Sequence, residues 1–346
     1  MMNKSKIDWC DFSWNPVTGC RHDCEYCYAR KQARRFSGDV RLNKRSDQLQ
    51  QVMHFNPERD KEAYDTFTLL KPFKSYNNTI LPFPVGFEPT LHEYRLPMPA
   101  QKKKPANIFV CSMADLFGDW VPTEWIKKVF KACEAAPQHN YLFLTKNPRR
   151  YERLILSGIL PKGANYWYGS TITTGEQEFF ISKDKQYNTF VSIEPILEKF
   201  PSRECAQSSG MKWGLAYVDW VILGPETGNR AGKVVPEREW IYSLADDITD
   251  IGIPLFMKDS LSTIVEAGRM IQEYPSELKH PEEKAIPRCK ECEHCVKEPD
   301  GKRGDRYYCE TGWIEAGYDD RGARHILGRY TRTSPPWCQK RGDCND

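Results

Sequence analysis

The sequence predicts an α/β protein built from repeated β-α units around a parallel sheet, followed by a small cysteine-rich module that binds metal. From residue 108 onward, short apolar runs rich in β-forming residues alternate with segments of helical periodicity. After residue 286 this periodicity is lost, and the composition shifts to cysteine, glycine and charge. We therefore expect one domain over residues 1–285 and a metal-binding tail over residues 286–346.

The overall composition excludes several classes of protein. The chain has 346 residues, of which 40% are hydrophobic and 28% charged, as is typical of a folded protein with a sizeable core. Its 50 basic and 47 acidic residues give a net charge of +3, which excludes a histone-like or polyacidic protein. The sequence contains no run of about 18 apolar residues and no apolar signal core near its start. We expect a cytoplasmic protein that does not bind a membrane.

Six apolar runs predict the strands of the sheet. They cover residues 108–113, 141–145, 166–170, 190–194, 220–224 and 254–258. Apolar residues at helical spacing predict the helices between them, at residues 126–133, 149–156 and 240–248. In a β/α barrel the carboxyl ends of the strands face the active site. We therefore expect a site made of the polar residues that end these runs, which include Ser112, Asp115, Lys146, Glu194, Glu226 and Lys258.

Residues 46–105 fit the alternating pattern poorly. They contain many prolines and mix polar with apolar residues, and they end at the basic run Lys102-Lys103-Lys104. This composition predicts an irregular insertion or a long βα connection within the first domain, and not a separate domain.

Three cysteines lie close together near the start of the chain. Cys20, Cys24 and Cys27 follow one another at intervals of four and then three residues. Soft thiolate ligands select iron–sulfur clusters or zinc. On a [4Fe-4S] cluster, three cysteines leave one iron open to another ligand. A structural zinc site would need a fourth protein ligand, and His22 is too close to Cys20 and Cys24 to be an obvious one, although a distant residue could serve.

This spacing, with Tyr26 directly before the last cysteine, resembles the signature of the radical S-adenosylmethionine (SAM) enzymes. The resemblance implies that Cys20, Cys24 and Cys27 hold a [4Fe-4S] cluster, and that Tyr26 packs over the cluster or the adenine. It also implies that SAM binds the open iron and is cleaved by one electron to methionine and a 5′-deoxyadenosyl radical. A reducing partner such as flavodoxin or ferredoxin is then expected.

Further motifs between residues 7 and 260 resemble, in the same order, an uncharacterised, phage-associated, three-cysteine radical-SAM-like family. They are Ile7-Asp8-Trp9, Trp14-Asn15-Pro16-Val17-Thr18-Gly19-Cys20, Ser112-Met113-Ala114-Asp115-Leu116-Phe117, Leu144-Thr145-Lys146-Asn147-Pro148, Ser192-Ile193-Glu194-Pro195, Trp220-Val221-Ile222-Leu223-Gly224-Pro225-Glu226-Thr227-Gly228 and Phe256-Met257-Lys258. Many relatives have a longer gap between the first two cysteines, and a pair of glycines where this chain has Gly224-Pro225. The resemblance implies a partial (β/α) barrel with the cluster loop after its first strand and SAM across the strand tips.

Cofactor-binding roles follow as hypotheses for five residues at the strand ends. The backbone of Gly224 and Gly228 would approach SAM, and Glu226 would accept hydrogen bonds from the ribose hydroxyls or the ammonium group. Ser112 and Asp115 would lie on the facing strand.

Catalytic roles follow as hypotheses for three charged residues. Lys146 and Lys258 are candidates to bind an anionic group such as a carboxylate or phosphate. Glu194 is a candidate to position the substrate or to move a proton. For the residues of both groups, a salt bridge or a helix cap is the alternative role.

The cysteines of the tail predict a second metal site. A C-x-x-C knuckle with two distant cysteines is a recurring way to close a tetrahedral zinc site. The expected zinc ligands, with Cys295 or Cys344 as possible substitutes, are Cys289, Cys292, Cys309 and Cys338. The alternative is an auxiliary [4Fe-4S] cluster, whose ligands would be Cys289, Cys292, Cys295 and Cys309.

Two segments concentrate basic residues. Residues 30–45 carry seven lysines and arginines against Asp39 alone, and residues 321–341 carry six with aromatic residues between them. Such mixtures suit phosphate contact and base stacking, so nucleic acid is a possible partner. A solvated helix face is the alternative for the charges, and a peptide, a protein or a small metabolite is the alternative substrate.

The leading functional hypothesis is a radical SAM enzyme that abstracts hydrogen from a substrate, with a nucleic-acid base or nucleotide as one candidate. A metal-stapled nucleic-acid-binding protein without chemistry is one alternative. A radical SAM enzyme that modifies a peptide or a partner protein is the other.

Overall fold

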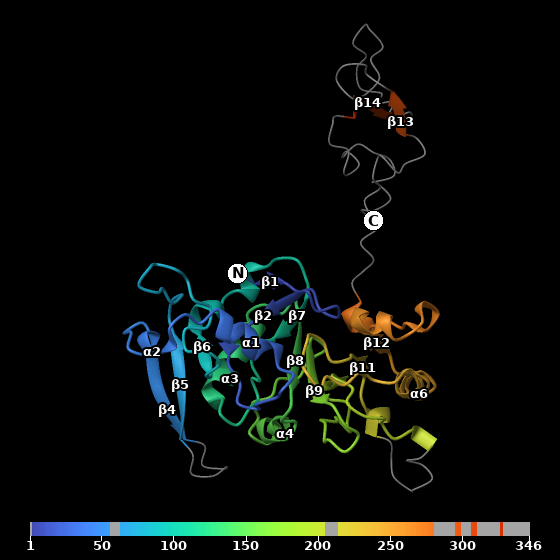
Figure 1. The fold of residues 1–346 in the computed structure, drawn as a ribbon, viewed down its shortest axis with the longest axis horizontal. Coiled ribbons are helices and arrows are strands. Elements are labelled where there is room, and N and C mark those ends of the chain that lie inside the picture. The colour runs from blue at the N-terminus through green and yellow to red at the C-terminus, as the bar shows by residue number, and fades with distance from the viewer. Residues whose placement is uncertain are drawn as a thin grey trace. The chain divides into compact units, whose positions relative to one another are not determined.

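The structure, a computed structural model, describes residues 2–55, 63–204 and 214–279, and three short strands of the tail at residues 295–298, 306–309 and 326–327 (Figure 1). The chain divides into two compact units, Met1–Leu278 and Lys279–Asp346. Within the described residues, no helix has the length and apolar character needed to cross a membrane.

An eight-stranded sheet organises the first unit. Its order is β1-β2-β7-β8-β9-β10-β11-β12, and every neighbouring pair from β2 to β12 is parallel, while β1 pairs antiparallel with β2. The strands are β1 Asn3–Lys4, β2 Phe12–Trp14, β7 Asn107–Val110, β8 Asn140–Thr145, β9 Tyr166–Ile172, β10 Asn188–Ile193, β11 Trp220–Leu223 and β12 Leu255–Met257. The six predicted strands are β7 to β12, which confirms the prediction of an α/β protein with a parallel sheet. The sheet described is open, with β1 and β12 at its edges.

The first unit contains five described α-helices, three of which the periodicity predicts. They are α1 Tyr28–Arg35, α2 Val40–Asn43, α3 Thr123–Glu134, α4 Arg149–Leu156 and α6 Arg238–Thr249. Short 3₁₀ helices complete the unit, namely η1 Glu93–Arg95, η2 Pro99–Gln101, η3 Gly214–Tyr217, η4 Asp259–Thr263, η5 Ala267–Arg269 and η6 Ser276–Leu278. The predicted helices at 126–133, 149–156 and 240–248 correspond to α3, α4 and α6, because each presents one apolar face to the core.

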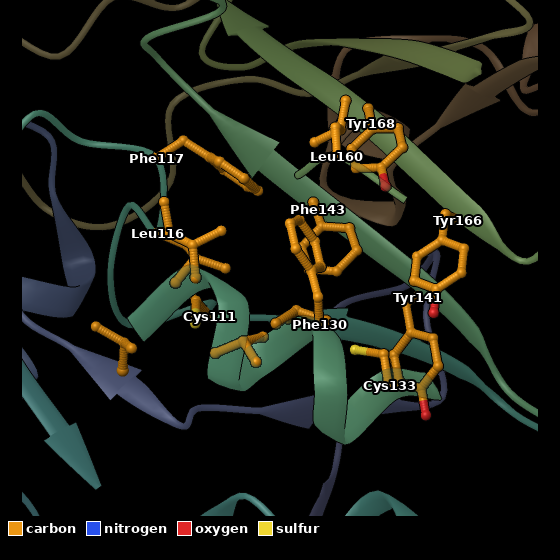
Figure 2. Packing of buried hydrophobic residues seen from close by; sticks show 14 of the residues in the cluster. Cys111, Leu116, Phe117, Phe130, Cys133, Tyr141, Phe143, Leu160, Tyr166 and Tyr168 are labelled. Carbon is orange, nitrogen blue, oxygen red and sulfur yellow. The ribbon is translucent and has the colours of Figure 1, made fainter. Parts of the chain in front are cut away.

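One face of the sheet packs against the helices. Phe130 of α3 lies 5.5 Å from Phe143 of β8, measured between ring centroids, and Phe143 stacks on Tyr168 of β9 at 5.6 Å (Figure 2). Cys133 and Tyr141 extend the same cluster along α3 and β8. These side chains are fully or almost fully buried, so they remove one face of the sheet from water.

The other face of the sheet surrounds Trp9. The Trp9 ring lies 4.7 Å from Phe109 of β7, and 6.2 Å from both Phe190 of β10 and Trp220 of β11. Gly169 of β9 leaves room for this packing, since a Cβ there would lie 2.3 Å from the Phe190 ring. Burial of both faces explains why the strands are continuous apolar runs.

The segment predicted as an irregular insertion contains three strands. A four-stranded sheet of order β3-β6-β5-β4 is formed by β3 Val17–Thr18, β4 Gln50–Phe55, β5 Ala63–Leu69 and β6 Thr90–His92. The prediction of an irregular insertion over residues 46–105 is therefore wrong for β4, β5 and β6. Exposed glutamines in β4 break the apolar pattern, and β3 joins the sheet from before the cysteine loop, which no local pattern reveals.

The tail contains a small antiparallel sheet. Its strands are β13 Cys295–Glu298, β14 Arg306–Cys309 and β15 Ile326–Leu327, and the backbone of Cys295 pairs directly with that of Cys309. The other candidate ligands of the tail lie outside the described residues; they are Cys289, Cys292, Cys338 and Cys344. The predicted domain boundary after residue 285 also falls outside the described residues.

Candidate functional site

A cavity of about 230 Å³ lies at the carboxyl ends of strands β7 to β12. Ile7, Trp9, Phe109 and Leu144 supply apolar walls, and the ends of the strands supply polar groups. The structure brings most of the sequence-predicted residues into this cavity, namely Cys20, Tyr26, Cys24, Cys27, Ser112, Asp115, Lys146, Glu194, Glu226 and Lys258. The predicted glycines, Gly224 and Gly228, are not part of its wall.

The loop that carries the three cysteines is held at both ends. At Gly19 the backbone has a φ of +92°, and a Cβ there would lie 2.2 Å from the Glu88 carbonyl oxygen, so only glycine fits. The Cys20 N–H donates to the Phe87 carbonyl at 3.1 Å. At the other end, Cys27 is the N-cap of α1, and its Sγ accepts from the Arg30 N–H at 3.4 Å. The loop therefore enters from the small sheet and leaves into α1.

The three cysteines of this loop are partly buried. Burial raises the pKa of the Cys20 thiol to about 12, and the negative charge of Asp115 adds to the effect. Burial also raises the pKa of the Cys27 thiol. Both side chains are therefore protonated when no metal is bound, and metal binding must displace these protons.

The three thiols do not converge on a single point. Among the described residues, no group of three or more His, Cys, Asp or Glu side chains surrounds a position for one metal ion. A cubane cluster makes no such demand, because each thiolate binds a different iron atom.

Asp115 connects the cysteine loop to two strands. Its Oδ2 lies 2.6 Å from His22 Nε2 and accepts from the Lys146 N–H at 2.9 Å, while its Oδ1 accepts from the Thr145 hydroxyl at 2.7 Å. Burial opposes the ionised form, but the hydrogen bond and charge of His22, with the other donors, outweigh it and lower the pKa of the Asp115 carboxyl. Both oxygens are thus engaged within the protein. Asp115 holds the loop in position and also lines the cavity, where its cofactor contact stays a prediction.

Lys146 and Tyr26 meet across the cavity. The Lys146 ammonium donates to the Tyr26 hydroxyl at 3.0 Å and lies 5.2 Å from the centre of its ring. Lys146 follows β8, whereas Tyr26 lies between Cys24 and Cys27. The contact orients the aromatic residue of the cysteine loop.

Glu194 and Lys258 form an ion pair at the carboxyl ends of β10 and β12. Gly224 of the intervening strand end makes room for this pair, because a Cβ there would lie 2.8 Å from Lys258 Cδ and 3.2 Å from Glu194 Cδ. Gly224 is thus needed by the ion pair and does not line the cavity. The sequence identified all three residues but not their contact.

Glu226 is paired with Arg230, which the sequence analysis missed. Arg230 Nε donates to Glu226 Oε1 at 2.6 Å and its Nη2 donates to Oε2 at 2.7 Å. Its Nη1 reaches Glu25 of the cysteine loop at 2.9 Å. The hydrogen bond from Arg230 lowers the pKa of the buried Glu226 carboxyl. The four-residue spacing from Glu226 was a weak signal in the sequence, and contact with Glu25 could be found only in the fold.

Comparison with known proteins identifies the family. A family model described as a protein of unknown function, DUF5131, matches residues 4–270. The chain belongs to the DUF5131 family. No protein with a curated description matches it.

Solved structures of spore photoproduct lyase are distantly similar to this DUF5131 protein. A mutant with dinucleoside spore photoproduct has a TM-score of 0.41 and 12% identity, and the match covers 74% of this chain and 78% of that chain. A double mutant with bound AdoMet and dinucleoside spore photoproduct has a TM-score of 0.37 and 11% identity, with coverage of 90% and 72%. At these TM-scores the likeness decides neither fold nor function.

Two residues that line the cavity of the DUF5131 protein each carry a buried polar atom without a hydrogen-bond partner among the described residues. Ser192 Oγ and Trp9 Nε1 are buried, and neither forms a hydrogen bond with a described residue. Both residues line the cavity. A buried donor without a partner is costly, so these atoms indicate a ligand that supplies acceptors. The sequence analysis named neither residue as a site residue, because nothing local distinguishes them from core residues.

Proposed function

We propose that this protein is a radical SAM enzyme, in which Cys20, Cys24 and Cys27 hold a [4Fe-4S] cluster and SAM occupies the adjoining cavity. The observation that carries the proposal is the shared cavity: three cysteines of one loop line the same space as the polar ends of β7 to β12. The proposal includes a partial (β/α) barrel, since the parallel strands present their carboxyl ends to this site.

The residues present suit such a cluster and cofactor. Three soft thiols on one loop are the expected donors for iron. The cavity also offers an apolar wall for an adenine ring, and two of its lining residues, Ser192 and Trp9, carry donors without a partner among the described residues. When bound, the cluster and SAM would supply a 5′-deoxyadenosyl radical for hydrogen abstraction.

The charged residues of the cavity would then orient the ligand. Glu226 is held ionised by Arg230, so it suits hydrogen bonds from ribose hydroxyls or an ammonium group. The Glu194–Lys258 pair offers one carboxylate and one ammonium at the cavity. An anionic group of the ligand would attract Lys258 and leave Glu194 free to accept a proton.

A second metal in the tail is part of the proposal. Its candidate ligands for zinc are Cys289, Cys292, Cys309 and Cys338, and an auxiliary cluster would use Cys295 in place of Cys338. The backbone pairing of Cys295 with Cys309 supports a site that includes both. The cluster at the first site also requires a reducing partner, such as flavodoxin or ferredoxin.

The experiment that tests the proposal is anaerobic reconstitution of the full chain with iron and sulfide. Bound iron, acid-labile sulfide and 5′-deoxyadenosine formed from SAM under reduction are measured for the wild type, Cys24→Ala and Cys133→Ala. Cys133 is buried in the core away from the site, so it controls for the loss of a thiol.

We expect 5′-deoxyadenosine from the wild type and Cys133→Ala, and none from Cys24→Ala. The bound iron and sulfide of Cys24→Ala should fall by the content of one cluster, and any remainder would belong to the tail. A wild type that folds but binds no iron at this loop would overturn the proposal. Such a result would leave a nucleic-acid-binding protein without radical chemistry as the better account.

A further inference from the structure

The segment from α1 to α2 carries an exposed basic surface beside the cavity. We define the basic surface as the exposed side chains of Lys31, Arg34, Arg35, Arg41, Lys44 and Arg45. α1 begins directly after Cys27, and the Asn43 side chain at the end of α2 donates to the Ser37 carbonyl, which follows α1, at 2.7 Å. The basic residues therefore belong to one segment that follows the cysteine loop directly. Figure 1 labels its two helices, α1 and α2.

No acidic side chain in the described part of the chain neutralises the charges of this surface. None of the six basic residues forms an ion pair with another residue that the structure describes. The acidic residues of the loop and of this segment already have partners: Asp23 pairs with Arg30, Glu25 pairs with Arg230, and Asp39 caps α2 through two backbone N–H groups. Unpaired cations in this number indicate a polyanionic partner.

A stripe of exposed residues along α1 connects this surface to the cavity. Ala29 and Ala33 bury the opposite face of α1, so Tyr28, Lys31 and Arg35 share an exposed stripe. Tyr28 is at the start of the stripe and also lines the cavity. The stripe is about 10 Å long, at about 1.5 Å per helical residue.

Exposed aromatic rings accompany the charges. Tyr28 is 50% exposed and Phe36 is 47% exposed, and the Arg35 guanidinium lies 5.3 Å from the centre of the Phe36 ring. Cations interleaved with flat exposed rings are the arrangement that binds a single nucleic-acid strand, with phosphates on the cations and bases on the rings. An acidic protein would use the charges but gains nothing specific from these rings.

We propose that the basic surface binds a nucleic-acid strand and directs one of its nucleotides past Tyr28 into the cavity. The inference rests on the proposed function, because it names nucleic acid as the substrate class of that site. It depends on residues that lie outside the cysteine loop, so it can be tested separately from the radical chemistry.

The test measures binding of a fluorescein-labelled DNA single strand of about 20 nucleotides, and of the RNA of the same sequence, by fluorescence anisotropy between about 50 and about 200 mM salt. The variant is Lys31→Gln/Arg34→Gln/Arg35→Gln. The matched control is Lys131→Gln/Lys183→Gln/Lys199→Gln, which removes three exposed positive charges from α3 and from the two segments that flank β10.

We expect the wild type and the control to bind, and the α1 variant to bind at least about tenfold more weakly at the lower salt. The plot of log K for binding against log salt concentration should become less steep by about 2 in the α1 variant. Each phosphate contact to a single strand contributes about 0.7 to the steepness, and the variant removes three cations. Phe36→Ala should weaken binding without changing the slope, since stacking releases no counterions.

The outcomes separate the two proposals when iron, sulfide and 5′-deoxyadenosine are assayed on the same preparations. Radical chemistry without strand binding, or equal binding by the α1 variant and the control, overturns this inference and leaves the proposed function standing. Strand binding that requires the α1 residues, with no 5′-deoxyadenosine, supports the binding surface and overturns the proposed function. If the α1 variant binds the strand normally but is no longer reduced by flavodoxin, the surface serves an acidic reductant and the inference is wrong.

Discussion

His22 Nε2 lies 2.6 Å from Asp115 Oδ2, and this contact joins the cysteine loop to the end of β7. Asp115 is buried and also accepts hydrogen bonds from Thr145 and from the backbone of Lys146 and Phe117. One carboxylate therefore fixes the loop against two neighbouring strand ends. The cysteines depend on it for their position although it contacts none of them through a hydrogen bond.

Asp115→Asn should lower the free energy of unfolding by about 2 kcal/mol, because an amide replaces a charged acceptor of several hydrogen bonds. It should also lower the iron bound on reconstitution, since the loop loses its connection to β7. Urea unfolding and iron analysis measure the two effects. Asp39→Asn is the control, because asparagine caps α2 as well as aspartate does. Equal stability of Asp115→Asn and the wild type would contradict the argument.

The Arg230–Glu226 pair should make the free energy of unfolding depend on pH. The pKa of Glu226 in the folded protein is below its ordinary value of 4.5, chiefly because Arg230 donates to it. Because the pKa of Glu226 is lower in the folded than in the unfolded protein, the ionised carboxylate stabilises the fold fully at pH values above about 4.5. This stabilisation is lost as the pH falls through the pKa of the folded state. The urea midpoints of the wild type and Arg230→Gln should therefore differ by a constant amount at pH 7 and 5, and converge below 4.5.

Arg149→Gln is the matched control for this pair. Arg149 also contacts a glutamate through two nitrogens, Glu178, but both side chains are well exposed. Solvent screens such a pair, so its removal should hardly move the midpoint at any pH. An Arg230→Gln midpoint that tracks the wild type at every pH would show that the Glu226 pair adds no stability.

Gly224→Ala should damage the reaction more than the fold. The new Cβ would lie 2.8 Å from Lys258 Cδ, so the Glu194–Lys258 pair must move. We expect a stability loss of about 1 kcal/mol or less and a fall of about tenfold in 5′-deoxyadenosine formation. Gly268→Ala is the control, because no atom lies within 4 Å of a Cβ built there. Full activity of Gly224→Ala would show that the position of the pair is unimportant.

Ser192 and Ser170 offer a matched comparison on neighbouring strands. Both are fully buried, but Ser170 Oγ accepts from the Phe180 N–H at 2.9 Å, whereas Ser192 Oγ has no partner among the described residues. Ser170→Ala should cost about 1–3 kcal/mol of stability, because it leaves that N–H unpaired, and should not change SAM affinity.

Ser192→Ala should show the opposite pattern. It removes a buried hydroxyl with no partner, so stability should stay the same or rise slightly, while SAM affinity falls about tenfold, or about 1.4 kcal/mol. Urea unfolding without SAM and calorimetric titration with SAM measure the two quantities. Unchanged SAM affinity in Ser192→Ala would remove this serine from the proposed ligand site.

Local patterns in the sequence were enough to find the elements of the main sheet. Strands β7 to β12 follow from short continuous apolar runs, and helices α3, α4 and α6 follow from a period of 3.6 residues; both signals depend only on near neighbours. The small sheet was missed because β4 exposes polar side chains and β3 comes from a distant part of the chain. No local pattern records a pairing between strands separated by so many residues.

The sequence by itself determined which residues end the strands and which cysteines share a loop. Because parallel strands present their carboxyl ends at one edge, it also determined that these residues would meet. The tertiary structure alone decided how they pair: Lys258 with Glu194, Lys146 with Tyr26, and Arg230 with both Glu226 and Glu25. Such partners are set by the register and packing of distant elements. A sequence pattern cannot distinguish one charged side chain from another of the same type, because only the fold brings particular pairs to hydrogen-bonding distance.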